Sequence, residues 1–373
     1  MRVEVVVIGA GIVGLAVAAE LARTHSVLVV EQHASCARET SSHNSGVIHA
    51  GIYYRTGSLK HRLCVAGNQD LYAWCERYGV PHRRIGKLIV AVASDETEHL
   101  DEIEARARAN DVPGLRRLTA RGSRAIEPTV PALAALLSST TGIVDQMALA
   151  RSIEAQARHR GAEFAYRHRV EGGERDSTMF HVKLLDADGG SSQISAGTIV
   201  NAAGHGAPIV AATFGYPLDG GTNVPVFRQS VNRGRYYDVT DPQVARAVRH
   251  LVYPVPQHGG AGLGVHVTLD LDGGLHLGPD AEWMASDEPI TYRNDDTRRA
   301  DFLRAARRLL PDLADNDIAP GQVGYRPKLA ATTDREADFL VWHDRGYVHL
   351  GGIESPGLTA ALPLAREVAS MLR

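Results

Sequence analysis

The chain has 373 residues, of which 44% are hydrophobic and 22% are charged, and its formal net charge is −3 at pH 7. This composition is typical of a soluble globular protein of about two domains. The charge lacks the basic surplus of nucleic-acid-binding proteins, and no apolar run reaches the roughly 18 residues that cross a bilayer. We therefore expect no nucleic-acid partner and no transmembrane segment.

The cysteine content points to a reducing compartment. Cys36, Cys64 and Cys75 are odd in number and contain no Cys-x-x-Cys pair, which argues against a disulfide framework and against a zinc site. A strand is expected from residue 2, so we expect no signal or transit segment before it. The expected location is cytoplasmic. A peripheral contact at the inner membrane face stays open, because a sequence does not exclude an exposed amphipathic patch.

The first 31 residues predict a strand, a glycine turn, a helix, a second strand and a terminal acid. Residues 2–8 are a β-branched run typical of a buried parallel strand, and Gly9-Ala10-Gly11-Ile12-Val13-Gly14 follows it. In this pattern the glycines make the tight turn, let the backbone approach a pyrophosphate, and let the helix pack on the strand. Glu31 ends the second strand, residues 26–30, where a carboxylate accepts ribose hydroxyls. The unit predicts dinucleotide binding. The alternative is a βαβ unit whose glycines serve packing alone.

Periodicity and turn residues predict the remaining elements in chain order. Helices are expected over residues 58–78 (with Ser58 as N-cap), 94–110, 148–160, 297–310 and 358–372. Strands are expected over residues 86–93, 163–168, 181–186, 193–195, 198–204 and 347–350, and residues 216–280 are strand-like. We expect the strand at 198–204 to join the first two strands, and those within 163–195 to form a small antiparallel set. A solvated helix face is predicted for five arginines at helical spacing: Arg298, Arg299, Arg304, Arg307 and Arg308.

A polar segment after Glu31 carries the most distinctive pattern, Ser42-His43-Asn44-Ser45-Gly46-Val47-Ile48-His49-Ala50-Gly51-Ile52-Tyr53-Tyr54. Further stretches are Gly86-Lys87-Leu88-Ile89-Val90-Ala91, Thr141-Gly142-Ile143-Val144-Asp145, Tyr253-Pro254-Val255-Pro256, Leu263-Gly264-Val265-His266-Val267-Thr268, Gly324-Tyr325-Arg326-Pro327-Lys328 and Gly352-Ile353-Glu354-Ser355-Pro356-Gly357-Leu358-Thr359. Over nearly the whole chain, these motifs resemble the L-2-hydroxyglutarate dehydrogenases and oxidases, FAD enzymes of the D-amino-acid-oxidase superfamily. One stretch departs from the pattern. Longer members commonly carry Phe-Arg-Gly leading into a tyrosine, and here Arg233-Gly234-Arg235-Tyr236-Tyr237 holds that place.

The resemblance implies an α/β (α+β) fold, in which a Rossmann-type FAD-binding domain is interleaved with an antiparallel-sheet substrate domain. The expected FAD-binding domain comprises residues 1–83, 141–215 and 321–373, and the substrate domain comprises residues 84–140 and 216–320. The cofactor is expected to be non-covalent FAD. The expected FAD-binding residues are Gly9, Gly11, Ile12, Val13, Gly14, Glu31, Gln32, Ser41, Ser42, His43, Ser45, Gly46, Val47, Ala203, Gly204, Arg326, Lys328, Gly352, Ile353, Glu354, Ser355, Pro356, Gly357, Leu358 and Thr359. No metal site is expected.

Oxidation of a 2-hydroxy acid on FAD needs a base for the hydroxyl proton and a positive pole near the flavin N1–C2=O edge. The turn at residues 351–359 opens the last helix, whose dipole supplies such a pole. His49 is the first candidate base, because an imidazole pKa near 6.5 suits proton transfer at neutral pH. The alternatives for His49 are a structural role beside the flavin and covalent flavin attachment. His266, in the middle of an apolar strand, is the second candidate base.

The substrate carboxylate needs a planar double donor, which favours arginine. Arg326 and Arg235 are the candidates, with Lys328 as a point charge near the flavin. Tyr53 and Tyr54 point to opposite faces of an extended segment, and Tyr53 is the one we assign to the pocket. In the expected reaction a histidine takes the hydroxyl proton, while the α-hydrogen passes as hydride to flavin N5. The expected conversion is L-2-hydroxyglutarate to 2-oxoglutarate.

Three other interpretations stay open at this stage. An amino-acid or sarcosine-type oxidase has the same fold, since fold does not determine function. A non-catalytic FAD-binding subunit would bind flavin without reducing it, and an NAD-dependent enzyme would be colourless. The electron acceptor is expected to be oxygen, a quinone or an electron-transfer protein.

Overall fold

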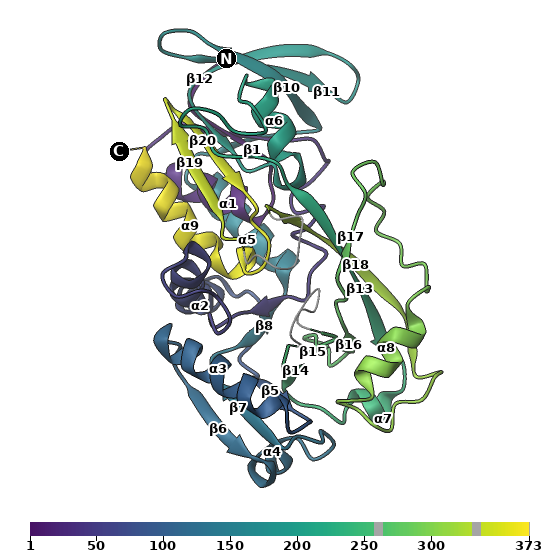
Figure 1. The fold of residues 1–373 in the computed structure, drawn as a ribbon. Coiled ribbons are helices and arrows are strands. Elements are labelled where there is room, and N and C mark those ends of the chain that lie inside the picture. Colours follow the sequence, from purple (N-terminus) through teal and green to yellow (C-terminus); the bar gives the residue numbers. More distant parts are fainter. Residues whose placement is uncertain (257–263, 330–336, 373) are drawn as a thin grey trace.

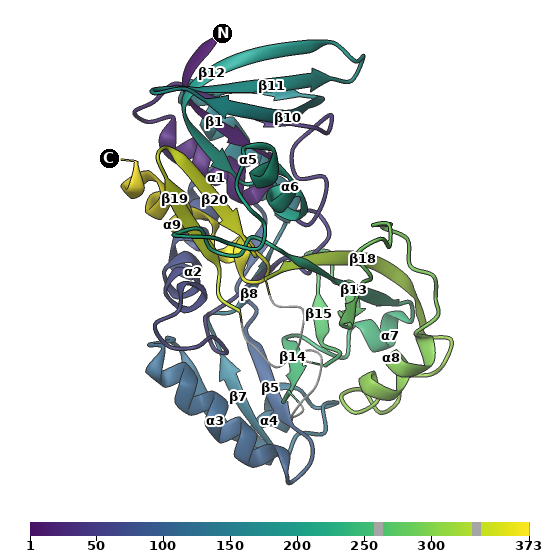
Figure 2. The same cartoon turned by 45° about the horizontal axis from the view of Figure 1, so that its top comes forward.

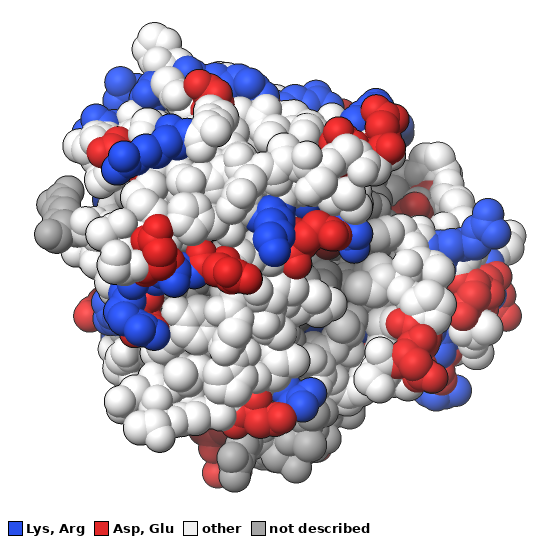
Figure 3. All heavy atoms as spheres, turned by 90° about the horizontal axis from the view of Figure 1, so that it is seen from above, with Lys and Arg blue, Asp and Glu red and all other residues white. Residues whose placement is uncertain are grey.

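The structure is a computed structural model that describes residues 1–256, 264–329 and 337–372 (Figure 1). In this part of the chain, the strands form three sheets of eight, nine and three strands. Figures 1 and 2 show the eight-stranded sheet in the upper half of the molecule and the nine-stranded sheet in the lower half. Side chains of both charge signs are interspersed on the face seen from above (Figure 3).

The eight-stranded sheet has a parallel centre. β1 pairs in parallel with both β2 and β12, β2 pairs in parallel with β9, and β12 pairs in parallel with β20. β10, β11 and β19 add antiparallel edges. Its strands are β1 (Arg2–Ile8), β2 (Val27–Glu31), β9 (Glu163–Tyr166), β10 (His168–Arg175), β11 (Phe180–Asp186), β12 (Ser191–Asn201), β19 (Leu340–Asp344) and β20 (Tyr347–Gly351).

Two predictions for this sheet have different outcomes. The strand expected at residues 198–204 does join the first two strands, as the end of the long strand β12. The strand at 163–168 was assigned to an antiparallel set, and this was wrong, because β9 pairs in parallel with β2. The error arose because a short strand of four residues carries no signal for the direction of its partner.

Helices cover this sheet and bury its apolar faces. They are α1 (Ile12–Leu21), α2 (Leu59–Tyr78), α5 (Gln146–His159), α6 (Ala207–Thr213) and α9 (Gly357–Met371). Most of α1 is buried, because α5 and α9 both pack on it. The Ser58 side chain accepts a hydrogen bond from His61 N, so the predicted N-cap of α2 is confirmed. α2 approaches α9 closely at Gly67, where a Cβ would lie 2.1 Å from Thr359 O.

The nine-stranded sheet is largely antiparallel and runs β17-β13-β16-β15-β14-β5-β7-β6, with β18 paired to β13. Its strands are β5 (Lys87–Ala91), β6 (Leu115–Thr119), β7 (Ala134–Ser138), β13 (Ser230–Val239), β14 (Leu251–Pro254), β15 (Val267–Leu269), β16 (Leu275–Leu277), β17 (Glu282–Trp283) and β18 (Ile318–Lys328). The small sheet contains β3 (Val47–Ile48), β4 (His82–Arg83) and β8 (Gly142–Val144). β18 runs across the predicted domain boundary at residues 320/321, and the division into domains stays a prediction.

Short helices accompany the second sheet: α3 (Glu96–Ala109), α4 (Ala120–Ile126), α7 (Pro242–Ala245) and α8 (Arg299–Ala306). α7 interrupts the segment predicted to be strand-like, because the Asp241 carboxylate caps it by accepting from Gln243 N and Val244 N. None of the helices within the described residues is long and apolar enough to cross a membrane.

The predicted solvated arginine face is only partly correct. Arg304 is exposed and pairs with Asp301, three residues away. Arg299 donates to Ile318 O at 2.7 Å, and Arg308 pairs with Glu96 of α3. α8 is therefore also tied to its neighbours through this face.

Replacement of Gly14 by alanine is expected to destabilise the protein by roughly 3 kcal/mol, the upper end of the overpacking range. A Cβ at Gly14 would lie 2.0 Å from the Gly9 carbonyl oxygen, which is backbone and has little room to move. Thermal denaturation and bound-FAD content measure the effect. The matched control is Gly122→Ala, whose Cβ would meet nothing closer than 3.6 Å. Equal stability of the two variants would contradict this account of the glycine turn.

Candidate active site

A cavity of about 900 Å³ lies between the two large sheets. Its lining comes from the glycine turn, the polar segment after β2, β13, β18 and the turn before α9. Among the predicted residues it brings together Gly11, Ile12, Val13, Ser41, His43, Ser45, Val47, His49, Tyr53, Gly204, His266, Arg326, Lys328, Ile353, Glu354, Ser355, Pro356, Gly357 and Leu358.

The nucleotide end of the cavity has the predicted geometry of a strand-turn-helix unit. Gly9 has φ +100°, and a Cβ there would lie 2.7 Å from Ala202 O. The buried Glu31 carboxylate accepts hydrogen bonds from Ala10 N and His33 N, each at 2.8 Å. These bonds fix the carboxylate at the end of β2, beside the turn. Gln32 lies next to it, and its amide donates to Glu39.

The polar segment that follows is held by its own hydrogen bonds. His43 Nδ1 lies 3.0 Å from Glu39 O and 2.9 Å from Ser42 Oγ, and its ring lies 4.0 Å from the ring of Tyr292. Asn44 donates to backbone oxygens three and four residues earlier. His43 therefore contacts the backbone of Glu39 and the ring of Tyr292.

His49 is anchored through its backbone, with its ring at the cavity. Its N–H donates to Thr359 Oγ1 at 3.0 Å, and its carbonyl accepts from Asn68 Nδ2 at 2.9 Å. The ring Nε2 lies 3.3 Å from Ser355 Oγ. Burial lowers the pKa of His49 to about 3, and the ammonium of Lys87 acts in the same direction. The imidazole is therefore neutral at pH 7, but its pKa in the free enzyme lies well below the value near 6.5 that favoured His49 as a base in the sequence.

Three aromatic rings line the cavity together with His49, and the buried Lys87 amine packs against two of them. The His266 ring stacks on Tyr253, with centroids 3.5 Å apart and an interplanar angle of 9°. Lys87 Nζ lies 4.9 Å from the ring centroid of Tyr53 and 4.7 Å from that of Tyr253. Burial raises the pKa of both tyrosines, so their phenols are neutral.

A buried carboxylate with two ammonium groups stands at the turn before α9. Glu354 Oε1 lies 2.9 Å from both Lys60 Nζ and Lys328 Nζ. Burial alone would raise the pKa of Glu354, but the two ammonium groups outweigh burial and lower it. The Glu354 carboxylate is therefore ionised at pH 7, and the ammonium groups of Lys60 and Lys328 more than balance its negative charge.

The two candidate clamp arginines have different environments. Arg326 lines the cavity, and its Nη1 donates to Asn232 Oδ1 at 2.5 Å and its Nη2 to Asp280 O at 3.2 Å. A Cβ at Gly234 would lie 2.8 Å from Arg326 Nη2, so this glycine leaves room for the guanidinium.

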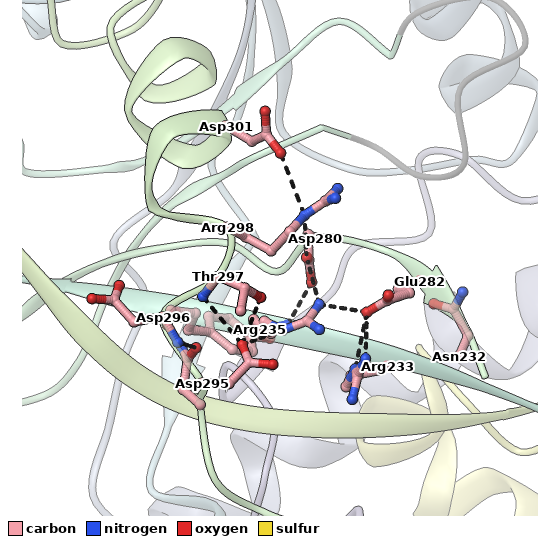
Figure 4. Close-up of polar contacts among 12 residues, drawn as sticks. Asn232, Arg233, Arg235, Asp280, Glu282, Asp295, Asp296, Thr297, Arg298 and Asp301 are labelled. Carbon is pink, nitrogen blue, oxygen red and sulfur yellow. Dashed lines mark hydrogen bonds and ion pairs between the residues drawn. The ribbon is translucent and has the colours of Figure 1, made fainter. Parts of the chain in front are cut away.

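Arg235 lies outside the cavity lining, in a network of charged groups (Figure 4). Its side chain is 4% exposed, and its nitrogens lie 2.6 Å from Glu282, 3.2 Å from Asp280 and 3.5 Å from Asp295. Because three carboxylates surround this guanidinium, the geometry does not support Arg235 as a substrate clamp. Arg298 extends the network to the cavity wall by lying between Asp280 and Asp301 (Figure 4).

Comparison with known proteins places this geometry in a family. The model of the family described as DAO, FAD dependent oxidoreductase, matches residues 4–371. The chain belongs to this family. It is 36% identical to an L-2-hydroxyglutarate dehydrogenase of Arabidopsis thaliana over 408 aligned positions, covering 99% of this chain and 83% of that protein. The corresponding human protein is 29% identical, with 98% of this chain and 88% of the relative covered.

Solved structures agree with this assignment. L-α-glycerophosphate oxidase from Mycoplasma pneumoniae with FAD bound superposes with a TM-score of 0.88 at 28% identity, covering 100% of this chain and 95% of that one. Glycine oxidase from Geobacillus kaustophilus has the same fold, with a TM-score of 0.79 at 20% identity, covering 100% and 94%. This DAO-family protein is therefore an FAD-dependent oxidoreductase. The glycine turn, the fixed Glu31 carboxylate and the large cavity fit that cofactor.

The remaining predicted residues of this DAO-family enzyme do not line the cavity: Gly9, Gly14, Glu31, Gln32, Ser42, Gly46, Ala203, Gly352, Thr359 and Arg235. Sequence reasoning missed Lys60, Lys87 and Asn232. It also assigned only Tyr53 to the pocket, which was wrong, because Tyr54 lines the cavity as well. The signal for Lys87 was a cation within an apolar strand, whereas Asn232 carried no local signal, because its position depends on the register opposite Arg326. Lys60 carried no signal, since its partner Glu354 is distant in sequence.

Lys87→Met is expected to alter how stability depends on pH. Burial lowers the pKa of Lys87 to about 7, an effect that Cys64 opposes. Below pH 7 both folded and unfolded chains hold this proton, and the full cost of the buried charge is present. Between pH 7 and the ordinary pKa of 10.5 the folded chain releases the proton first, so this group adds stability as pH rises.

Urea unfolding of the wild type and Lys87→Met near pH 6 and pH 9.5 tests this expectation. The free energy of unfolding of the variant minus that of the wild type should be larger near pH 6 than near pH 9.5. A stability difference that is equal at both pH values, or larger at high pH, would show that the pKa of Lys87 is not lowered in the folded protein.

Proposed function

We propose that this enzyme oxidises a small 2-hydroxy acid, foremost L-2-hydroxyglutarate to 2-oxoglutarate. The observation that carries the proposal is the shared cavity lining of His49, His266 and Arg326, next to the glycine turn. A histidine and an arginine supply the base and the carboxylate donor that such a substrate requires. The relatives named L-2-hydroxyglutarate dehydrogenase favour this substrate among the 2-hydroxy acids.

Arg326 binds the substrate carboxylate in this proposal. Its guanidinium is held by Asn232 Oδ1 and Asp280 O, which fix its plane and leave the other N–H groups for substrate. A guanidinium fixed in this way loses little conformational freedom when it binds a carboxylate. It therefore orients the α-carbon as well as supplying charge.

His49 takes the hydroxyl proton at Nε2. The hydrogen bonds of its backbone to Thr359 and Asn68 hold the residue in place, and Ser355 lies beside the accepting nitrogen. An anionic substrate next to the ring raises the imidazole pKa, because an opposite charge stabilises the imidazolium. Binding of the substrate thus makes His49 a stronger base. His266, stacked on Tyr253, is the second candidate for the same proton.

FAD, when bound, would supply the two-electron acceptor for this oxidation. Residues 353–358 line the cavity and α9 begins at Gly357, so the positive end of that helix lies at the cavity wall. The Lys60–Glu354–Lys328 group carries a net charge of +1 in the same wall. Both features stabilise negative charge that develops there.

A substrate panel with product identification tests the proposal. Purified holoenzyme is incubated with L- and D-2-hydroxyglutarate, other 2-hydroxy acids, and the 2-amino acids glutamate, glycine and sarcosine, together with an artificial electron acceptor. The expected result is formation of 2-oxoglutarate from the L-hydroxy acid. Turnover of an amino acid with release of ammonia, methylamine or formaldehyde, and none of a hydroxy acid, would replace this proposal by an amine oxidase.

A further inference from the structure

Asn232 is a buried asparagine at the cavity, and none of the roles assigned to the other cavity residues explains it. It lies in β13 directly opposite Arg326 of β18 in the antiparallel register. It is 1% exposed and lines the cavity. Figure 4 shows it on the β13 strand that also carries Arg233 and Arg235. Because cross-strand partners project to the same face of a sheet, its side chain and that of Arg326 lie side by side.

The hydrogen bonds of Asn232 fix the orientation of its amide group. Arg326 Nη1 donates to Oδ1 at 2.5 Å, and since arginine only donates, the oxygen side of the amide must face it. The amide nitrogen, Nδ2, is buried and has no hydrogen-bond partner among the described residues. Buried donors are almost always paired in folded proteins, so this N–H group calls for an acceptor that the described residues do not provide.

The charges around Asn232 indicate the nature of that acceptor. The guanidinium of Arg326 lies beside Asn232. The carboxylate of Glu282 forms ion pairs with Arg233 at 2.7 Å and with Arg235 at 2.6 Å. An N–H donor adjacent to a guanidinium at a cavity wall suits a carboxylate oxygen, which accepts from both groups at once.

We propose that Asn232 is a substrate-binding residue whose Nδ2 donates to the carboxylate held by Arg326, while its Oδ1 positions that guanidinium. The identity of the substrate in this inference rests on the proposed function. The binding of a carboxylate by Asn232 does not. Asn232 then selects for a carboxylate against an uncharged group at this position.

The test is ligand binding, which does not require turnover. Glutarate, a dicarboxylate without a hydroxyl group, is titrated into the holoenzyme while the visible flavin spectrum is recorded, with 1,5-pentanediol as the uncharged analogue. The variants are Asn232→Leu, which removes the donor and the acceptor, and Asn232→Asp, which is isosteric and places a negative charge beside the carboxylate. Asn316→Leu, at an exposed position, is the control. Thermal denaturation and FAD content verify each fold.

We expect glutarate to bind about 10-fold more weakly to Asn232→Leu and about 100-fold more weakly to Asn232→Asp. KM for the hydroxy acid should rise in parallel, with kcat changed much less and the FAD content unchanged. Unchanged glutarate affinity in both variants would overturn the inference, as would a wild-type spectrum that does not respond to glutarate. Loss of FAD from both variants would also overturn it by assigning the Asn232 donor to the cofactor. Glutarate binding that depends on Asn232, in an enzyme that oxidises no hydroxy acid, would retain this inference and reject the proposed function.

Discussion

Arg326→Lys is expected to raise KM for L-2-hydroxyglutarate by about 100-fold, and Arg326→Met by more. Removing one partner of a buried, hydrogen-bonded charge pair costs about 2–5 kcal/mol, and 2.8 kcal/mol is about a factor of 100. Lysine keeps the charge but cannot bind a carboxylate through two parallel N–H groups, nor bond Asn232 and Asp280 as the guanidinium does. Steady-state kinetics and glutarate titration measure the loss.

The control for Arg326 is Arg228→Met. Arg228 pairs with Asp219 and its side chain is 61% exposed, so its loss should leave KM unchanged. FAD content separates a substrate role from a cofactor role. An Arg326→Lys variant with a wild-type KM would contradict the proposed clamp, and loss of FAD together with an unchanged KM would assign Arg326 to the cofactor.

His49→Gln is expected to lower kcat by about 10²- to 10⁴-fold, the range for losing a general base, while FAD stays bound. Glutamine preserves the backbone bonds to Thr359 and Asn68 and replaces only the ring. Single-turnover reduction of the flavin, followed by its visible absorbance, isolates the chemical step. The control is His343→Gln, at an exposed position of β19.

The pH profile provides an independent test of His49. A base must be deprotonated to act, and burial lowers the pKa of His49 to about 3 in the free enzyme. His49 should therefore contribute no fall in kcat/KM between pH 8 and pH 5. If His49→Gln reduces the flavin at the wild-type rate, the base is not His49, and His266→Gln becomes the variant to measure.

The sequence predicted the scaffold well where local pattern and global fold agree. β1 matches residues 2–8, and α2, α3, α5 and α9 lie within two residues of their predicted bounds at each end. These elements are long or strongly apolar, and two of the helices, α2 and α5, have a capping side chain, so a single stretch of sequence holds the signal. β9 and the Arg298–Arg308 segment were less predictable, because strand direction and ion-pair partners depend on distant residues.

The site shows the same limit. His49, His266 and Arg326 were found through motifs, and the cavity brings them together. Asn232 acquires its significance only from the register that places it opposite Arg326, and Lys87 from the rings of Tyr53 and Tyr253 packed against it. Arg235 was a reasonable candidate in sequence, but Asp280, Glu282 and Asp295 enclose its guanidinium. Contacts between residues far apart in sequence decide each of these cases.

The most direct test of the central claim is an anaerobic titration of the holoenzyme with L-2-hydroxyglutarate, followed at the visible band of oxidised flavin. We expect the band to bleach as one equivalent of substrate per flavin is added, 2-oxoglutarate to form in the same amount, and the D-enantiomer to have no effect. A yellow protein whose band persists in excess L-2-hydroxyglutarate would contradict the proposed substrate.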